Sequence, residues 1–162
     1  MFQGSVVSLH IAPARSAPMQ TVGEVRAVPG RGLVGDRFLL PPGAAERKPD
    51  GLSDVTLIEV EAVEALRTVL GDPDDQARPI ELAPVEARRN IVTAGVPLNH
   101  LLGREFRVGD VLMRGWQLCE PCTHLEALTG RRLIHGLLHR GGLRAQILSE
   151  GVIRVGEAIV PT

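Results

Sequence analysis

The segment Arg107-Val-Gly-Asp-Val-Leu112 (RVGDVL) places a Gly-Asp pair between two short runs of apolar residues. The chain repeats the arrangement at Arg154-Val-Gly-Glu-Ala-Ile159 (RVGEAI). A glycine inside a strand-like run indicates a bulge or a sharp bend, as at the corner of a barrel. Both segments therefore predict β-structure that bends at the glycine. The likeness is too short to indicate a duplicated domain.

Similar short strand-like runs occur along the rest of the chain, and helical spacing is confined to a few places. The predicted strands are 4–10, 21–28, 105–108, 111–118, 143–148 and 152–160, with another entered through Glu86–Thr93. Residues 55–58 form a further short apolar run. The predicted helices are 58–69, ended by Gly71 and Pro73, and the shorter 123–128 and 132–138. Strict β-α-β alternation is missing, so we predict a mainly β fold with α insertions, a β-barrel.

A Rossmann-type sheet is disfavoured although Gly30-Arg-Gly-Leu-Val-Gly35 spells G-x-G-x-x-G. That fingerprint requires a helix to open directly after the glycines. Here the chain soon meets Pro41-Pro42, and 40–52 has the composition of an exposed excursion.

Composition bounds the class of protein. The 162 residues are 44% apolar with a formal net charge of −1, which predicts one domain over 1–162 and no partner nucleic acid. Three Phe, one Trp and no Tyr argue against a stacking platform for single strands. Neither an export signal nor an apolar run of membrane-spanning length is evident, so we expect a cytoplasmic protein with reduced cysteines.

The two cysteines lie in Trp116–His124 (WQLCEPCTH), as Cys119-x-x-Cys122. With His135 and His139 they match the ligand spacing of a zinc finger. Glu126 and Arg132 stand where a finger needs core residues, and a large apolar domain needs no metal to fold. We expect no zinc.

Two other interpretations of the cysteines remain open. A dithiol pair would need both thiols well placed, whereas only Cys122 stands where a helix would begin, which favours it as the reactive thiol. Alternatively, both are inert buried sulfurs.

Several phrases in order then indicate a family. They are Gly32–Arg37 (GLVGDR), Arg88–Thr93 (RRNIVT), Leu101–Gly109 (LLGREFRVG), Cys119–Cys122 (CEPC), Arg140–Ala145 (RGGLRA) and Gly151–Gly156 (GVIRVG). Together they resemble the MOSC domain, the family named for the C-terminal region of molybdenum cofactor sulfurase, and in particular its stand-alone bacterial members.

The resemblance implies a MOSC-type β-barrel with a cleft for the molybdenum cofactor (molybdopterin). It implies that Cys122 is both the catalytic residue and the molybdenum ligand. A thiolate suits a soft molybdenum centre. The resemblance further implies cofactor-binding roles for Arg88 and Asn90 of the R-x-N phrase, for Arg37 and Arg144, and more loosely for Arg15 and Ser16. Arginine offers a planar fork for a phosphate and asparagine an amide for a pterin edge.

Three functions follow from the resemblance. The first is reduction of N-hydroxylated small molecules by a molybdenum enzyme, which would need a separate electron donor and would build its site alone or with a second copy as a homodimer. The second is a sulfur carrier or cofactor-delivery module, loaded by a sulfur donor protein, that holds a persulfide on Cys122, with Cys119 as a resolving thiol. The third is a non-catalytic interaction barrel. His124 is a further candidate because it lies two residues from Cys122.

Overall fold

The computed structural model describes residues 1–41, 54–68 and 79–162. The strands are β1 (Gly4–Ile11), β2 (Gln20–Val22), β3 (Glu24–Val28), β4 (Gly32–Leu33), β5 (Val55–Glu59), β6 (Ile91–Ala94), β7 (Glu105–Val108), β8 (Val111–Leu118), β9 (Leu143–Ile147), β10 (Gly151–Arg154) and β11 (Ala158–Pro161). The helices are α1 (Val60–Ala65), α2 (Thr123–Thr129) and α3 (Ile134–Leu137), with 3-10 turns η1 (Pro84–Ala87) and η2 (Leu98–Leu101).

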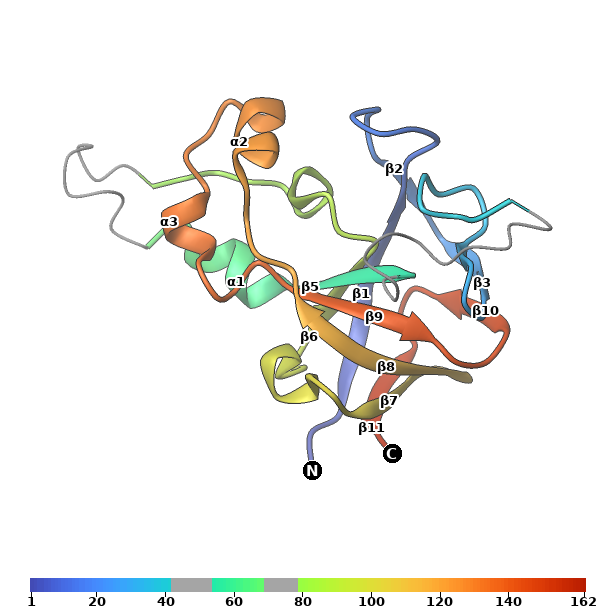
Figure 1. The fold of residues 1–162 in the computed structure, drawn as a ribbon. Coiled ribbons are helices and arrows are strands. Elements are labelled where there is room, and N and C mark those ends of the chain that lie inside the picture. The colour runs from blue at the N-terminus through green and yellow to red at the C-terminus, as the bar shows by residue number, and fades with distance from the viewer. Residues whose placement is uncertain (42–53, 69–78) are drawn as a thin grey trace.

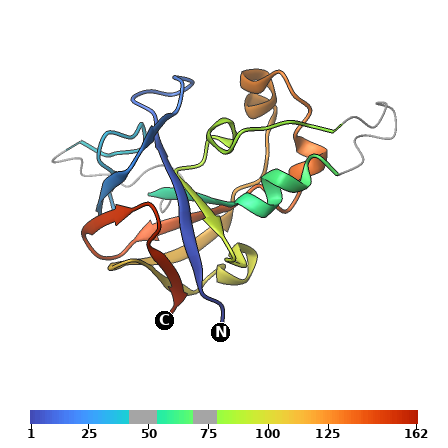
Figure 2. The ribbon, with the colours of Figure 1, turned by 180° about the vertical axis from the view of Figure 1, so that it is seen from behind.

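The strands form a closed barrel, which confirms the predicted fold class. Around the barrel the order is β1, β11, β7, β8, β9, β5 and β6, and β6 pairs with β1 again. Figure 2 shows β1 and β6 beside one another on the near side of this barrel. A small second sheet, β10-β3-β4, lies against one side.

Two predicted strands are each divided between the eight-stranded sheet, which forms the barrel and carries β2 at its edge, and the small sheet. The predicted strand 21–28 breaks at Gly23 into β2 and β3, and the predicted strand 152–160 breaks into β10 and β11. The two breaks lie together, because the amide of Val155 donates to the carbonyl oxygen of Gly23 at 3.1 Å. The predicted bends occur: Gly109 and Gly156 both have positive φ, 55° and 87°.

One β-α-β unit is present although the sequence showed no such alternation. Strands β5 and β6 are parallel, and α1 lies between them in the chain. The predicted helix 58–69 begins later than its spacing suggested, because Ile58 still belongs to β5. Its predicted end, and most of the 40–52 excursion, lie outside the described residues.

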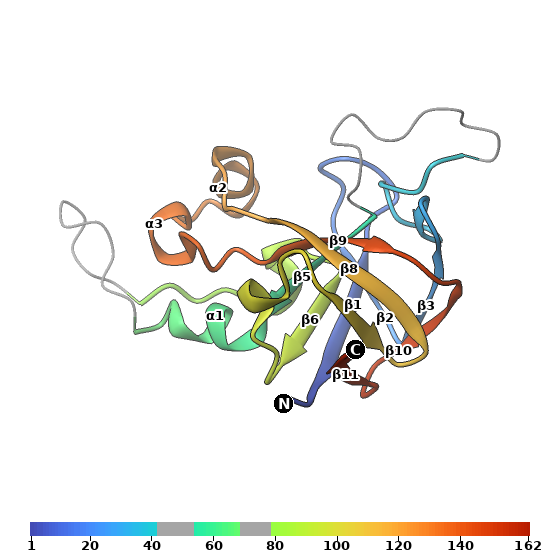
Figure 3. The same cartoon turned by 60° about the horizontal axis from the view of Figure 1, so that its bottom comes forward.

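Alternation along the strands produces two apolar clusters. Residues such as Leu57, Ile91 and Phe106 point inward and fill the barrel. Ile58 and Val92 point outward, and the helices cover them with Leu66, Leu125 and others. Figure 3 shows α1, α2 and α3 together on one side, opposite β3 and β10. This outer layer brings the cysteine-bearing segment against the barrel. Among the described helices, none has the length and apolar character needed to cross a membrane.

Candidate functional site

The two cysteines occupy different environments. Strand β8 ends at Leu118, and the next residue, Cys119, is 4% exposed, with its amide donating to the carbonyl oxygen of Gly142 at 2.8 Å. Cys122 is exposed and is the N-cap residue of α2 in extended conformation. The thiol of Cys122 is therefore accessible to solvent, whereas that of Cys119 is buried.

Arg89 fixes the backbone behind the cysteines. Its side chain is buried and donates from Nε to the carbonyl oxygen of Gly141 at 2.9 Å, from Nη2 to that of Cys119 at 3.2 Å, and from Nη1 to that of Ala87 at 3.1 Å. A buried guanidinium bonded to three carbonyls ties three segments at one point. The sequence predicted a cofactor contact at Arg88 and no role for Arg89. Its position two residues before the buried strand β6 is a sequence signal that could have found it.

The Gly-Asp-Arg phrase forms a tight turn. Buried Asp36 accepts from the amide of Ala12 at 3.0 Å and from that of Phe38 at 3.2 Å. Arg37 contacts Asp36 at 3.3 Å and donates from Nη2 to the carbonyl oxygen of Arg88 at 3.4 Å. Burial lowers the pKa of Arg37, an effect that Asp36 partly offsets and that neighbouring Arg88 and Arg89 reinforce. Three guanidinium groups therefore gather near one carboxylate.

Arg88 is held in an unusual backbone conformation. Its φ is 59°, in the left-handed region that non-glycine residues rarely adopt. Its Nη1 donates to the carbonyl oxygen of Ala17 at 2.8 Å. Burial lowers the pKa of Arg88 as well, and Arg89 lowers it further against the opposing effect of Asp36. A bound anion would favour the charged guanidinium here.

The loop between β1 and β2 connects these arginines to the cysteine segment. The hydroxyl of Ser16 lies 3.3 Å from His124 Nε2, in the first turn of α2. Ala17, next in the chain, accepts from Arg88. We refer to Ser16, Arg88, Cys122 and His124 as the cysteine rim. Arg15, adjacent to Ser16, is exposed.

A cavity of about 360 Å³ opens beside Ser16 and Arg88 of the cysteine rim. Polar groups of Ser16 and Arg88 share its lining with apolar ones such as Met19 and Leu128. The ion pair between Glu86 and Arg131, 2.8 Å, borders it. Its mixed walls suit a ligand with both an anionic and an apolar part.

Two further predicted cofactor contacts, Asn90 and Arg144, belong to the barrel wall. Asn90 is fully buried: its Oδ1 accepts from the amide of Thr56 at 3.1 Å and from the Thr56 hydroxyl at 3.0 Å, and its Nδ2 donates to the carbonyl oxygen of His10 at 3.1 Å. Its side-chain amide therefore joins β1 and β5 directly before β6 begins. Arg144 lies half-buried on β9, in register with Thr56 of β5 and Gln117 of β8.

The two cysteines and two histidines with zinc-finger spacing do not form a metal-ligand group among the described residues. Among residues 1–41, 54–68 and 79–162, no three His, Cys, Asp or Glu side chains are grouped so that they could hold a metal ion. His139 instead contacts Glu120 at 3.0 Å.

Comparison with known proteins adds three findings. The model of the MOSC domain family matches residues 51–160. Among solved structures, the YuaD protein of Bacillus subtilis superimposes with a TM-score of 0.75 at 17% identity, over 98% of this chain and 97% of that one. YiiM from Geobacillus stearothermophilus gives a TM-score of 0.70 at 16% identity, over 98% of this chain and 75% of that one. YiiM from Escherichia coli gives 0.64 at 17% identity, over 100% of this chain and 70% of that one. No curated protein sequence matches the chain.

Proposed function

Because this chain belongs to the MOSC domain family, which is associated with the molybdenum cofactor, we propose that it binds that cofactor at the cysteine rim. The carrying observation is that one loop contacts both Arg88 and the first turn of α2, the helix for which the exposed Cys122 is the N-cap residue. Cys122 is two residues from His124, which meets Ser16, and the residue after Ser16 receives the Arg88 hydrogen bond. These bonds connect residues that are far apart in the chain.

The chemistry of the donor set fits the group. A soft metal takes a thiolate, and Cys122 is the one exposed thiol in the described residues. A phosphate takes a guanidinium, and Arg88 keeps donors beyond its bond to Ala17. The cavity of about 360 Å³ falls within the usual size of a small-molecule site. When bound, the cofactor would supply two-electron redox chemistry.

The residues of the chain would then divide the work. Cys122 would be the protein ligand through Sγ. Arg88 and Arg15 would hold anionic groups, while Arg37 keeps Arg88 in place through its carbonyl oxygen. Asn90 and Arg89 would position the strand and the loops behind the site. The role of Arg144 in anion binding stays part of the proposal.

We further propose that the protein, with the molybdenum cofactor bound, reduces N-hydroxylated small molecules. The electrons would come from a separate donor protein. The apolar lining of the cavity supports this class, because it can take the carbon body of such a substrate. A sulfur-carrier role is the second candidate. Its support is the same exposed thiol, although Cys119 is too buried to resolve a persulfide without local opening.

Metal content tests the proposal. The protein would be purified from a host that makes the cofactor, beside Cys122→Ala and, as matched control, Cys119→Ala. We expect near-stoichiometric molybdenum in the parent and the control and its loss in Cys122→Ala. Equal molybdenum in both variants would contradict the ligand assignment. No molybdenum, together with added sulfur on Cys122 after incubation with a cysteine desulfurase, would establish the sulfur carrier instead.

Reduction of an aromatic amidoxime by the molybdenum-loaded protein, with a reduced viologen as electron donor, tests the reaction class. Turnover that disappears in Cys122→Ala is the expected result. If the molybdenum-loaded protein reduced no amidoxime, cofactor binding would still stand, but the proposed reductase activity would be contradicted.

A further inference from the structure

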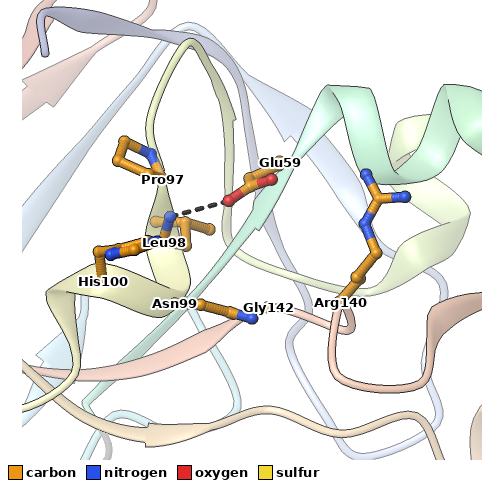
Figure 4. A pocket seen from close by; sticks show the side chains of 7 residues that line it. All are labelled: Glu59, Pro97, Leu98, Asn99, His100, Arg140 and Gly142. Carbon is orange, nitrogen blue, oxygen red and sulfur yellow. Dashed lines mark hydrogen bonds between the residues drawn. The ribbon is translucent and has the colours of Figure 1, made fainter.

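A second cavity, of about 250 Å³, lies apart from the cysteine rim and shares no residue with it. Figure 4 shows its walls, which come from the end of β5, from the 97–100 segment and from the 140–142 segment. Both a carboxylate and a guanidinium line it. Because these two charges are not paired with each other, each can pair with an oppositely charged group of one ligand.

Glu59 supplies the negative charge. Its Oε1 accepts from the amide of Leu98 at 2.8 Å, which fixes the carboxylate in place. No described residue donates to the other oxygen, Oε2. Asn99 supplies a second acceptor: its Nδ2 donates to the carbonyl oxygen of His139 at 2.8 Å, so its Oδ1 is left to accept. An ammonium group carries three donors and can use both acceptors.

Arg140 supplies the positive charge. Its amide donates to the carbonyl oxygen of Leu137, but its guanidinium bonds to no described residue and forms no ion pair with Glu59. Figure 4 shows the Arg140 guanidinium and the Glu59 carboxylate at separate places around the pocket. Because the N–H groups of the Arg140 guanidinium have no partner among the described residues, they can donate two parallel hydrogen bonds to the carboxylate of a ligand.

The walls are fixed before any ligand arrives. The amide of Gly95 donates to Glu61 Oε1 at 2.7 Å, which holds the loop before Pro97. The amide of His139 donates to Glu120 Oε2 at 2.8 Å, which holds the segment before Arg140. Gly142 has φ of 115°, and a side chain there would meet the carbonyl oxygen of Leu57. Pre-organised walls reduce the entropic cost of binding.

We propose that this cavity binds a free α-amino acid, with its ammonium on Glu59 and Asn99 and its carboxylate on Arg140. The volume of about 250 Å³ lies just below the range of roughly 300–1,000 Å³ that is usual for drug-sized ligands, so it suits a smaller molecule such as an amino acid. Pro97 and Leu98 offer apolar surface to a side chain. The site does not depend on the cysteine rim, and apoprotein should bind the ligand.

Calorimetric titration of the whole chain with L-leucine and L-glutamine tests the proposal. The matched analogues of leucine are 4-methylpentanoate, which lacks the ammonium, and 3-methylbutylamine, which lacks the carboxylate. We expect at least one of the two amino acids to bind, and each analogue to bind about tenfold more weakly or not at all, because a lost charge-assisted bond has about that effect.

Two variants locate the site. Glu59→Gln keeps an oxygen for the Leu98 amide and removes the charge, and Arg140→Gln alters an exposed side chain. Each should weaken amino-acid binding about tenfold. Arg104→Gln, also exposed, is the control and should bind as the parent does. Failure of both amino acids to bind, equal binding of the singly charged analogues, or binding unchanged in both variants would overturn the proposal.

Discussion

Ser16 Oγ and His124 Nε2 lie 3.3 Å apart, although 108 residues separate them in the chain. The contact fastens the loop between β1 and β2 against the first turn of α2, which begins directly after Cys122. Through Ala17 the same loop receives the side chain of Arg88. The loop between β1 and β2 therefore links the residues of the cysteine rim, because it contacts both His124 and Arg88.

Ser16→Ala should loosen the cysteine rim without unfolding the protein. Ser16 is exposed, so the free energy of unfolding should change by less than about 0.5 kcal/mol. One lost hydrogen bond should weaken cofactor retention about threefold to tenfold. Molybdenum content at limiting cofactor measures the effect, with Ser5→Ala on β1 as control. A large loss of stability with unchanged molybdenum would make the contact purely structural.

The two thiols should differ in their reactivity toward iodoacetamide. Cys122 is exposed and Cys119 is buried, so the native protein should be alkylated at Cys122 alone. Cys119 should react only when urea unfolds the chain. Peptide mass spectrometry at timed intervals gives both rates. Equal native rates would show that the cysteine segment opens readily.

Arg89→Leu should destabilise the protein by about 3 kcal/mol, because three buried carbonyls lose their donor. Arg88→Leu is the matched comparison: it removes a single bond to Ala17 and should cost about 1 kcal/mol. Urea unfolding measures both. We expect the order to reverse for cofactor binding, with Arg88→Leu the more harmful when stability is taken into account. Equal stability losses would contradict the positioning role of Arg89.

Gly142→Ala should be far more damaging than Gly130→Ala. Both glycines have positive φ, 115° and 65°, so each substitution strains the backbone. At Gly130 a Cβ meets nothing within 4 Å, and the cost should be about 1 kcal/mol, the price of the left-handed conformation. At Gly142 the Cβ would clash with the carbonyl oxygen of Leu57 on β5. Thermal unfolding should show a small decrease for Gly130→Ala and failure to fold, or a large decrease, for Gly142→Ala.

His10 should make stability depend on pH. Its ring is held between the hydroxyls of Ser8, 2.9 Å from Nε2, and Thr21, 3.2 Å from Nδ1. Burial lowers the pKa of His10 in the folded protein below the ordinary 6.5. Above 6.5 the ring is neutral in both states. As the pH falls through 6.5, the unfolded chain takes up a proton that the folded one resists, so stability decreases.

The measurement is the free energy of unfolding of the parent and of His10→Gln between pH 7.5 and about 5, the window just around the ordinary histidine pKa. Subtracting the variant isolates this residue from other titrating groups. The parent should lose stability more steeply than His10→Gln. If the free energy of unfolding of the parent and of His10→Gln changed with pH in parallel, the hydroxyls of Ser8 and Thr21 would be able to accept a charged ring, and the prediction would be wrong.

Much of the fold could be predicted from local pattern. Strands β7 and β8 lie where their apolar runs predicted, with the bend at Gly109, and α2 begins directly after Cys122. The failures have one cause. Gly23 marks a point where the chain passes from one sheet to another, and the residues on both sides of it are in strands, so the local pattern shows no break. The parallel pairing of β5 and β6 likewise depends on α1 packing outside the barrel.

The sequence by itself determined the fold class and the candidate reactive groups. The spacing of short apolar runs and bends predicted a closed β fold, and the Cys-x-Pro-Cys phrase and the arginines in motifs supplied the candidate groups. What only the tertiary structure decided is which of these groups meet. It left the thiol of Cys122 exposed, turned the amide of Asn90 into the barrel wall, and set Arg89 to hold the backbone. The physical reason is that burial and hydrogen-bond partners are supplied by segments distant in the chain, and local sequence carries no record of them.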